Sequence, residues 1–277
     1  MPVILISRGT MSGVHLLVEC LNERTGIPCV SREDLEEIVD HHGKLAKRVL
    51  EKLAHAASAY DQFSELRWPY MVLMRKAMLE EISADNVVYH GYSAQFLLPI
   101  IRHFVRVRIE APLNMRLTMT MDRLKCDEQA AREYITEADQ HRVKWARFMF
   151  GKDIRNTLFY DINLNLGHMT IDTVCGILES IMRQKDFQAT SESQLAVDRL
   201  HLATDIEVAL VTDPRTESFE ISAEVTGDGI QLIGPYLEDS HLESVLEIAG
   251  SIHGAKNLHY SPGYAPRFEK GVYDGQG

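Results

Sequence analysis

A short apolar run followed by small and polar residues opens the chain. Residues 3–6 are continuously apolar and include β-branched members, which predicts a short buried strand. Residues 7–13 are mostly small or polar and predict a turn, after which apolar residues return at helical spacing at Val14, Leu17 and Leu21. A strand, a loop of small residues and a helix are typical of phosphate sites, because loop N–H groups and the helix N-terminus both direct positive charge toward an anion.

The loop departs from the usual phosphate-binding motif, G-x-x-x-x-G-K-[ST]. Gly13 matches the last glycine, whereas Val14 stands in place of the lysine and His15 in place of the serine or threonine. We expect a side chain at Gly13 to block the approach of a phosphate. Taken alone, these residues are also compatible with an ordinary strand-to-helix turn, so both interpretations stay open.

Apolar strands alternate with helical segments through the first 185 residues. Further strands are expected at 27–30, 86–91, 104–109 and 159–166. The alternation predicts an α/β fold, a parallel sheet with helices on both faces. Basic and apolar residues alternate in 104–109, which indicates a strand at a sheet edge or with one face in water. Ligands of parallel sheets bind at the carboxyl ends of the strands, so we expect the loop and residues 91–93 to face one crevice.

A basic segment at 137–155 stands out in an acidic chain. The formal net charge is −11, yet Arg142, Lys144 and Arg147 lie within about two helical turns of one another. A solvated helix with ion pairs, such as Asp139 with Arg142, is one explanation. The alternative is a lid that closes over a polyphosphate, because phosphoryl transfer requires cations near the charge that develops.

A polar segment near residue 190 separates this half from the remainder. Beyond it, the pattern predicts a helix, a hairpin, a second helix and a last strand, which together make a small α+β domain. The predicted organisation is a domain at 1–185, a linker at 186–194, a small domain at 195–260 and a flexible tail at 261–277.

Composition limits the classes of partner. The acidic balance argues against broad nucleic-acid binding and against a polybasic membrane surface. No apolar run approaches the ~20 residues of a membrane span, and the N-terminus lacks the features of a signal peptide. The four cysteines have no metal-binding spacing. We therefore expect a cytoplasmic protein with no nucleic-acid partner, no integral membrane segment and no protein-bound metal.

Motifs in a fixed order carry a family resemblance. They are Ile6-Ser7-Arg8, Gly26-Ile27-Pro28, Val88-Tyr89-His90-Gly91, Val105-Arg106-Val107-Arg108-Ile109-Glu110-Ala111-Pro112, Asp139-Gln140-His141-Arg142 and Tyr160-Asp161-Ile162-Asn163. In order and spacing they resemble the cytidylate-kinase-like family of P-loop nucleoside monophosphate kinases. The resemblance covers the whole predicted first domain. It implies a five-stranded parallel sheet, ATP with Mg²⁺ as cofactor, a monophosphate acceptor site and a lid at 139–151.

The resemblance also implies roles for individual residues. Nucleotide phosphates would be bound by Ser7, Arg8, Gly9, Thr10, Met11, Ser12, Gly13, Val14 and His15. The acceptor would be bound by Arg32, Gly91 and Tyr92, and the catalytic cations would be Arg142, Arg147 and Lys144.

Two departures from the family pattern lie at Met11, where glycine is usual, and at Tyr92, where arginine is usual. Two functions are therefore considered. One is phosphoryl transfer from ATP to a pyrimidine nucleoside monophosphate. The other is a nucleotide sensor, a pseudokinase with weak or no catalysis.

Motifs in the second half carry a separate resemblance. They are Asp213-Pro214-Arg215-Thr216, Asp228-Gly229-Ile230-Gln231-Leu232-Ile233-Gly234 and Ile252-His253-Gly254-Ala255. Residues 195–260 resemble a BON domain, which implies a non-enzymatic module that binds a membrane, a small ligand or another protein. The many acidic residues disfavour anionic lipid, so a protein or small-ligand partner is expected.

Overall fold

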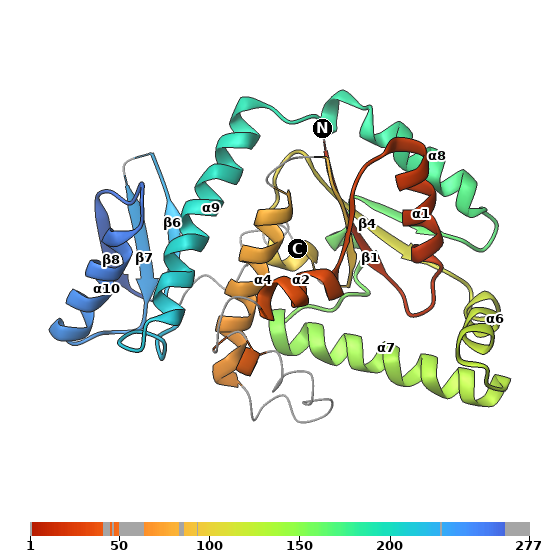
Figure 1. Cartoon of the computed structure of the whole chain (residues 1–277), viewed down its shortest axis with the longest axis horizontal. Coiled ribbons are helices and arrows are strands. Elements are labelled where there is room, and N and C mark those ends of the chain that lie inside the picture. The colour runs from red at the N-terminus through yellow and green to blue at the C-terminus, as the bar shows by residue number, and fades with distance from the viewer. Residues whose placement is uncertain are drawn as a thin grey trace. The chain divides into compact units, whose positions relative to one another are not determined.

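A computed structural model describes residues 2–40, 45, 47–49, 64–82, 86–92, 94–227 and 229–263 (Figure 1). Contacts divide the chain into two units. Unit 1 comprises Met1–Asp34 and Ala84–Thr190, and unit 2 comprises Leu35–Ser83 and Ser191–Gly277. Most of the tail expected at 261–277 lies outside the described residues.

Unit 1 is built on a five-stranded parallel sheet. Its strands are β1 (Val3–Arg8), β2 (Cys29–Ser31), β3 (Val88–Gly91), β4 (Phe104–Glu110) and β5 (Ile162–Asn165). Their order is β2-β3-β1-β4-β5, and every neighbouring pair is parallel. Residues Val3 to Ile6 of β1 are at most 2% exposed, because this central strand is buried on both faces. The predicted α/β class is confirmed.

Helices α1 (Val14–Thr25) and α8 (Ile171–Met182) lie side by side against the sheet (Figure 1). Their apolar faces share one core cluster with Ile4 and Ile6 of β1 and with Val105, Val107 and Ile109 of β4. The short helix α5 (Ala94–Leu97) contacts β1 and β3. These contacts fix the strand ends and the start of α1, which is where the candidate site lies.

Two further helices follow β4. Helix α6 (Leu113–Leu124) packs on α7 (Glu128–Phe150) through Leu117, Ala131 and Ile135. Asp127 caps α7 by accepting a hydrogen bond from the Ala130 N–H, and Gly151 ends the helix with a φ of 66°. The segment expected as a lid, 139–151, is therefore the C-terminal half of a single helix of 23 residues and its cap.

The position of β4 corrects a sequence-based expectation. This strand was expected at an edge or with a wet face, but it lies between β1 and β5. Arg106 and Arg108 are only 9% and 8% exposed. Arg106 donates to both oxygens of Asp161, at 3.0 and 2.7 Å, and this pairing allows a basic side chain inside the sheet.

Unit 2 contains a small mixed sheet. Strand β6 (Ser222–Val225) is antiparallel to β7 (Ile230–Gly234), which is parallel to β8 (Leu258–Pro262). Helices α9 (Ser191–Thr212) and α10 (Asp239–Ser251) pack with this sheet around Ile206, Leu232 and Val245. The predicted small α+β region is therefore present.

Unit 2 also includes a helix from the first half of the chain. Helix α4 (Arg67–Ile82) packs on α9, and both belong to unit 2. Helix α2 (Arg32–Asp40) begins directly after β2. The segment 186–194, expected as a linker, contains most of the 3-10 helix Lys185–Phe187 and the beginning of α9. The domain boundaries expected from the sequence stay a prediction.

Candidate functional site

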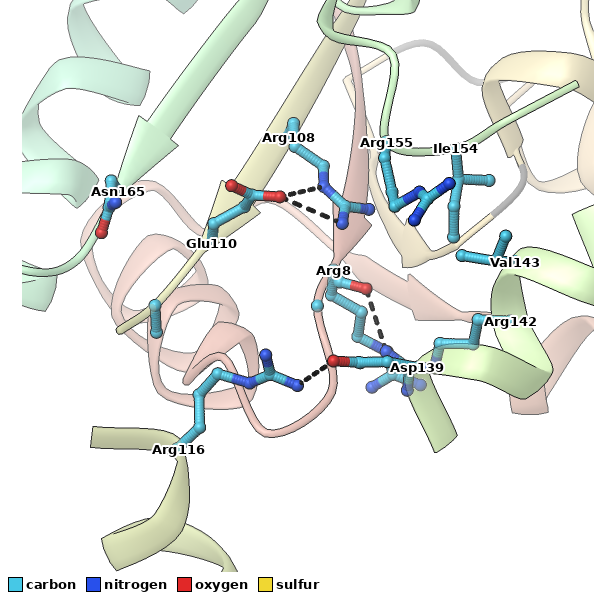
Figure 2. A pocket seen from close by; sticks show the side chains of 12 residues that line it. Arg8, Arg108, Glu110, Arg116, Asp139, Arg142, Val143, Ile154, Arg155 and Asn165 are labelled. Atoms are coloured by element: carbon cyan, nitrogen blue, oxygen red, sulfur yellow. Dashed lines mark hydrogen bonds and ion pairs between the residues drawn. The ribbon is translucent and has the colours of Figure 1, made fainter. Parts of the chain in front are cut away.

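A pocket of about 230 Å³ lies at the carboxyl ends of β1, β4 and β5 (Figure 2). It is lined by Arg8, Gly9, Arg108, Glu110, Ala111, Arg116, Asp139, Arg142, Val143, Ile154, Arg155 and Asn165. All of these residues belong to unit 1. The carboxyl ends of the strands were the expected location, because ligands of parallel sheets bind there. Of the two segments expected to face one crevice, the loop contributes Gly9, whereas Gly91 and Tyr92 do not line the pocket.

The pocket is strongly positive in an acidic protein. Five of its lining residues are arginines, and only Glu110 and Asp139 are acidic. The chain as a whole carries a formal net charge of −11. An excess of guanidinium groups in a concave site favours an anion, and planar guanidinium groups match the oxygens of phosphate and carboxylate.

Arg142 on α7 is the clearest sign of crowded positive charge. Its Nη1 donates to the backbone oxygen of Arg8 at 3.0 Å (Figure 2). Burial, together with the neighbouring Arg8 and Arg108 and against the effect of Asp139, lowers the pKa of Arg142 to about 10. A bound anion would offset this repulsion, because it stabilises the charged form of the arginine.

Arg108 connects the pocket to a buried hydrogen-bond network. Its Nη1 donates to the Ser7 hydroxyl at 3.1 Å, and its Nε and Nη2 donate to Glu110 at 3.3 and 3.2 Å. The Ser7 hydroxyl lies 3.2 Å from the Tyr160 hydroxyl, which donates to the Ile154 backbone oxygen at 2.8 Å. Burial raises the pKa of Tyr160, so the phenol stays protonated at neutral pH. The network holds Arg108 in place at the end of β4.

The β1–α1 loop, residues 9–13, carries hydrogen-bond donors without protein partners. The hydroxyl groups of Thr10 and Ser12 are buried and have no hydrogen-bond partner in the described part of the chain. Helix α1 begins after Gly13 with no side-chain cap. Buried hydroxyls and an uncapped helix N-terminus both favour an anion at the loop, since such groups are rarely left without partners.

Two loop residues have left-handed backbones. Gly13 has a φ of 79° and Met11 a φ of 53°. Glycine adopts this region without a steric penalty, whereas methionine does not. The structure therefore explains why glycine suits the Met11 position.

The expectation that a side chain at Gly13 would block a phosphate is wrong. A Cβ atom there would meet Leu166 at 3.4 Å, Ile171 at 3.6 Å and Met115 at 3.7 Å. These atoms are apolar, and none of the three residues lines the pocket. A substitution at Gly13 would instead act through backbone strain and crowding of the core, so it is a poor test of phosphate binding.

The structure separates the predicted loop residues by environment. Val14 is 2% exposed and packs in the core, and His15 is exposed. Arg8 and Gly9 line the pocket. Position 14, where the usual motif has lysine, therefore directs its side chain into the core rather than to a phosphate.

The three cations predicted on α7 also lie in different places. Arg142 lines the pocket, whereas Lys144 and Arg147 are exposed and do not line it. Arg147 donates to Asp153 at 2.9 Å. The catalytic roles assigned to these residues from the sequence stay predictions.

The predicted acceptor residues lie close together. Arg32 donates to the Tyr92 hydroxyl, and its guanidinium carbon lies 4.5 Å from the centre of the Tyr92 ring. The Arg142 guanidinium lies 5.3 Å from the same ring centre, so Tyr92 connects these residues to the pocket. At Gly91 a side chain would collide with the Tyr89 phenol.

Arg108, Glu110, Arg116, Asp139, Arg155 and Asn165 line the pocket but were not assigned to the site from the sequence. Arg108 belongs to one of the motifs that carry the family resemblance, and the basic character of Arg108 and Arg116 was the available signal. One of the two explanations of the basic segment paired Asp139 with Arg142, but Asp139 accepts a hydrogen bond from Arg116 at 2.6 Å. That pairing joins two helices, and helical spacing alone does not reveal it.

Neither a metal site nor a membrane-spanning helix is found within the described ranges. No group of three or more His, Cys, Asp and Glu residues is arranged to hold a metal ion there. Across the same residues, no helix combines the length and apolar character that crossing a membrane requires.

A scan against family models matches residues 3–168 to the cytidylate kinase-like family. The match covers more than half of the 277 residues. The chain belongs to the cytidylate kinase-like family. The search of curated proteins found no match. Membership places the chain among nucleotide-binding, kinase-like proteins.

Solved structures resemble the chain at low sequence identity. An uncharacterized protein from Eubacterium ventriosum ATCC 27560 is 18% identical with a TM-score of 0.51, and the match covers 67% of this chain and 100% of that one. Shikimate kinase from Bacteroides thetaiotaomicron is 14% identical with a TM-score of 0.39, covering 66% of this chain and 99% of that one. Thymidylate kinase from Candida albicans is 16% identical with a TM-score of 0.36, covering 70% and 93%. The first similarity supports the fold, and the P-loop kinase-like architecture agrees with the family.

Proposed function

We propose that unit 1 binds the phosphate groups of ATP and transfers a phosphoryl group to a pyrimidine nucleoside monophosphate. The observation that carries this proposal is the pocket with five arginines at the carboxyl ends of a parallel sheet in a cytidylate kinase-like chain. Phosphoryl transfer depends mainly on positioning and on positive charge around the transferred group. Clustered arginines supply that charge.

In this proposal the β1–α1 loop and the pocket arginines both contribute to ATP binding. The Thr10 and Ser12 hydroxyls, which have no hydrogen-bond partner among the described residues, and the N-terminus of α1, which has no side-chain cap, are suited to hold phosphate oxygens. Arg8 and Arg142 supply cations on the side of the pocket, in place of the lysine that Val14 replaces. Mg²⁺ would arrive with the nucleotide and neutralise phosphate charge, because Glu110 and Asp139 are already paired with arginines.

The acceptor monophosphate is assigned to Arg32, Gly91 and Tyr92. Arg32 has its guanidinium beside the Tyr92 ring, and Arg142 reaches the same ring from the pocket. An acceptor phosphate bound there would lie near the cations that bind ATP, which is the requirement for direct transfer.

A second candidate function is nucleotide sensing without efficient transfer. The observation that favours it is the burial of Val14 in the core, which leaves no side chain at that position to contact the β- and γ-phosphates. We also propose that residues 195–260 form a BON-like module that binds a protein or a small ligand, and that the protein is cytoplasmic. The mixed sheet with two helices is compatible with such a module.

One experiment decides between the two functions. Calorimetry measures ATP binding with and without Mg²⁺, and chromatography measures diphosphate formation from CMP, dCMP, UMP and AMP. Binding together with diphosphate formation supports the kinase, and binding without diphosphate formation supports the sensor. Absence of binding by ATP and by inorganic pyrophosphate would contradict both.

A further inference from the structure

Arg116 on α6 joins the β1–α1 loop to helix α7. Its Nε donates to the Thr10 backbone oxygen at 2.7 Å, and its Nη2 donates to Asp139 at 2.6 Å. Figure 2 shows the Arg116 guanidinium directed toward Asp139. The Arg116 side chain is 16% exposed. Because two of its donors already bind protein oxygens, Arg116 is suited to orient other groups rather than to bind ligand alone.

A second contact between the loop and α7 lies nearby. Arg142 donates to the backbone oxygen of Arg8 at 3.0 Å. Asp139 and Arg142 are three residues apart, so they lie on one face of α7. Arg142 therefore connects α7 to the Arg8 carbonyl, and Asp139 connects it to the Thr10 carbonyl through Arg116.

The Thr10 carbonyl matters because of the residue that follows it. Carbonyl and N–H groups of a trans peptide point in opposite directions, so a Thr10 oxygen held toward α6 directs the Met11 N–H away from α6. Met11 has a left-handed backbone, which is costly for this residue unless contacts hold it. The Arg116 contact therefore stabilises the loop in the conformation that presents its donors.

We propose that Arg116 is a positioning residue that holds the loop and the C-terminal half of α7 in the arrangement that binds phosphate. The proposal rests on the phosphate-binding function proposed above. It assigns a favourable role to Asp139 in spite of its negative charge, because Asp139 connects α7 to Arg116 and so places Arg142 over the loop.

Asp139→Ala separates positioning from simple electrostatics. Loss of a negative charge from an anion site strengthens binding on electrostatic grounds, whereas loss of the Arg116 contact weakens it. We expect ATP with Mg²⁺ to bind Asp139→Ala about tenfold more weakly in calorimetry. Asp139→Glu should restore most of the affinity, because it keeps the carboxylate.

A double-mutant cycle tests whether the two residues act together. Arg116→Ala should weaken ATP binding to a similar extent, and Arg116→Ala combined with Asp139→Ala should be no weaker than Arg116→Ala alone, because both changes break one contact. The matched control is Glu128→Ala, which removes an equal charge from the same helix. Glu128 pairs with Arg132 at 2.8 Å and does not line the pocket, so affinity should change less than twofold.

Hydrogen exchange gives a readout that needs no ligand. Asp139→Ala should raise exchange in residues 9–13 and 139–150, and Glu128→Ala should not. If the parent chain binds ATP and Asp139→Ala binds it equally or more tightly, the positioning role is overturned while the proposed function stands. If the parent binds neither ATP nor pyrophosphate, the proposed function is overturned, and unchanged exchange in Asp139→Ala would then overturn the positioning role as well.

Discussion

Arginines in the two units of this protein have different surroundings. In unit 2, Arg75 on α4 pairs with Glu207 on α9, and these side chains are 7% and 2% exposed. Glu207 also accepts a hydrogen bond from the Ala223 N–H at 2.9 Å. In unit 1, Arg8, Arg108 and Arg142 crowd a pocket that holds fewer acids than arginines.

The two regions differ in whether the charge of a buried side chain is balanced by other groups of the fold. Burial raises the pKa of Glu207, while Arg75 and the Ala223 N–H favour its charged form, so its charge is compensated within the fold. In the pocket, Arg142 is compensated only in part, as its lowered pKa indicates, whereas the other four arginines each pair with a carboxylate. In unit 2, Arg75 holds α4 on α9, whereas the proposed function uses the positive charge of the unit 1 pocket to bind phosphate.

The largest expected effect comes from removing the C-terminal part of unit 2, residues 191–277. In a fragment of residues 1–190, α4 loses its packing against α9, so hydrogen exchange in α4 should rise at least about a hundredfold. Helix α1 is the control, since it packs on α8 within the fragment. An α4 that keeps its protection would instead support an independent domain at 1–185.

Breaking the buried pair tests the structural half of the comparison. Glu207→Ala leaves the Arg75 charge buried without Glu207 and should lower the free energy of unfolding of unit 2 by about 3–5 kcal/mol, measured by urea denaturation. Asp205→Ala is the control, because the Lys76–Asp205 pair is partly exposed and its loss should cost less than about 1 kcal/mol. Equal losses in both variants would show that burial does not set the cost.

Removing a pocket arginine tests the binding half. Arg142→Ala should weaken ATP binding at least about tenfold, since a charge-assisted contact contributes about 1.5–3 kcal/mol, with little change in melting temperature. Arg132→Ala on the same helix is exposed and should leave affinity unchanged. Arg147→Ala tests in the same assay whether Arg147 contacts the nucleotide phosphates, as the sequence predicted. Unchanged affinity in Arg142→Ala would contradict the pocket as the phosphate site.

The smallest effect concerns the strained loop residue. Met11→Gly should relieve the left-handed backbone and raise ATP affinity severalfold, because the loop then reaches its binding conformation at less cost. The control is Gly26→Ala, which places a side chain on another left-handed residue, just beyond the C-terminus of α1 and outside the pocket lining. It should lower the free energy of unfolding by about 1 kcal/mol and leave ATP affinity unchanged. A lower affinity in Met11→Gly would mean that the Met11 side chain contributes to binding.

Local patterns predicted much of unit 1 correctly. The first strand, the loop after it and the helix from Val14 follow from apolar spacing and small residues, and each depends on neighbours in the chain, although the strand extends to Arg8 and the loop is confined to residues 9–13. The parallel sheet followed from the alternation of strands and helices. The alternation of basic and apolar residues in β4 wrongly predicted an edge strand or a strand with one face in water. Arg106 is instead buried against Asp161, which lies 55 residues away in the sequence.

The sequence by itself determined the fold class, the presence of a strand-to-helix loop of small residues before Val14 and the positive character of the segment that became α7. Only the tertiary structure decided which cations share a pocket, that Val14 packs in the core, that Arg116 holds both Thr10 and Asp139, and that α4 belongs with the C-terminal elements. The physical reason is the distance along the sequence over which the deciding contacts act. Secondary structure depends on spacing over a few residues, whereas a site depends on contacts such as Arg142 with Arg8, which are 134 residues apart and meet only when the sheet has formed.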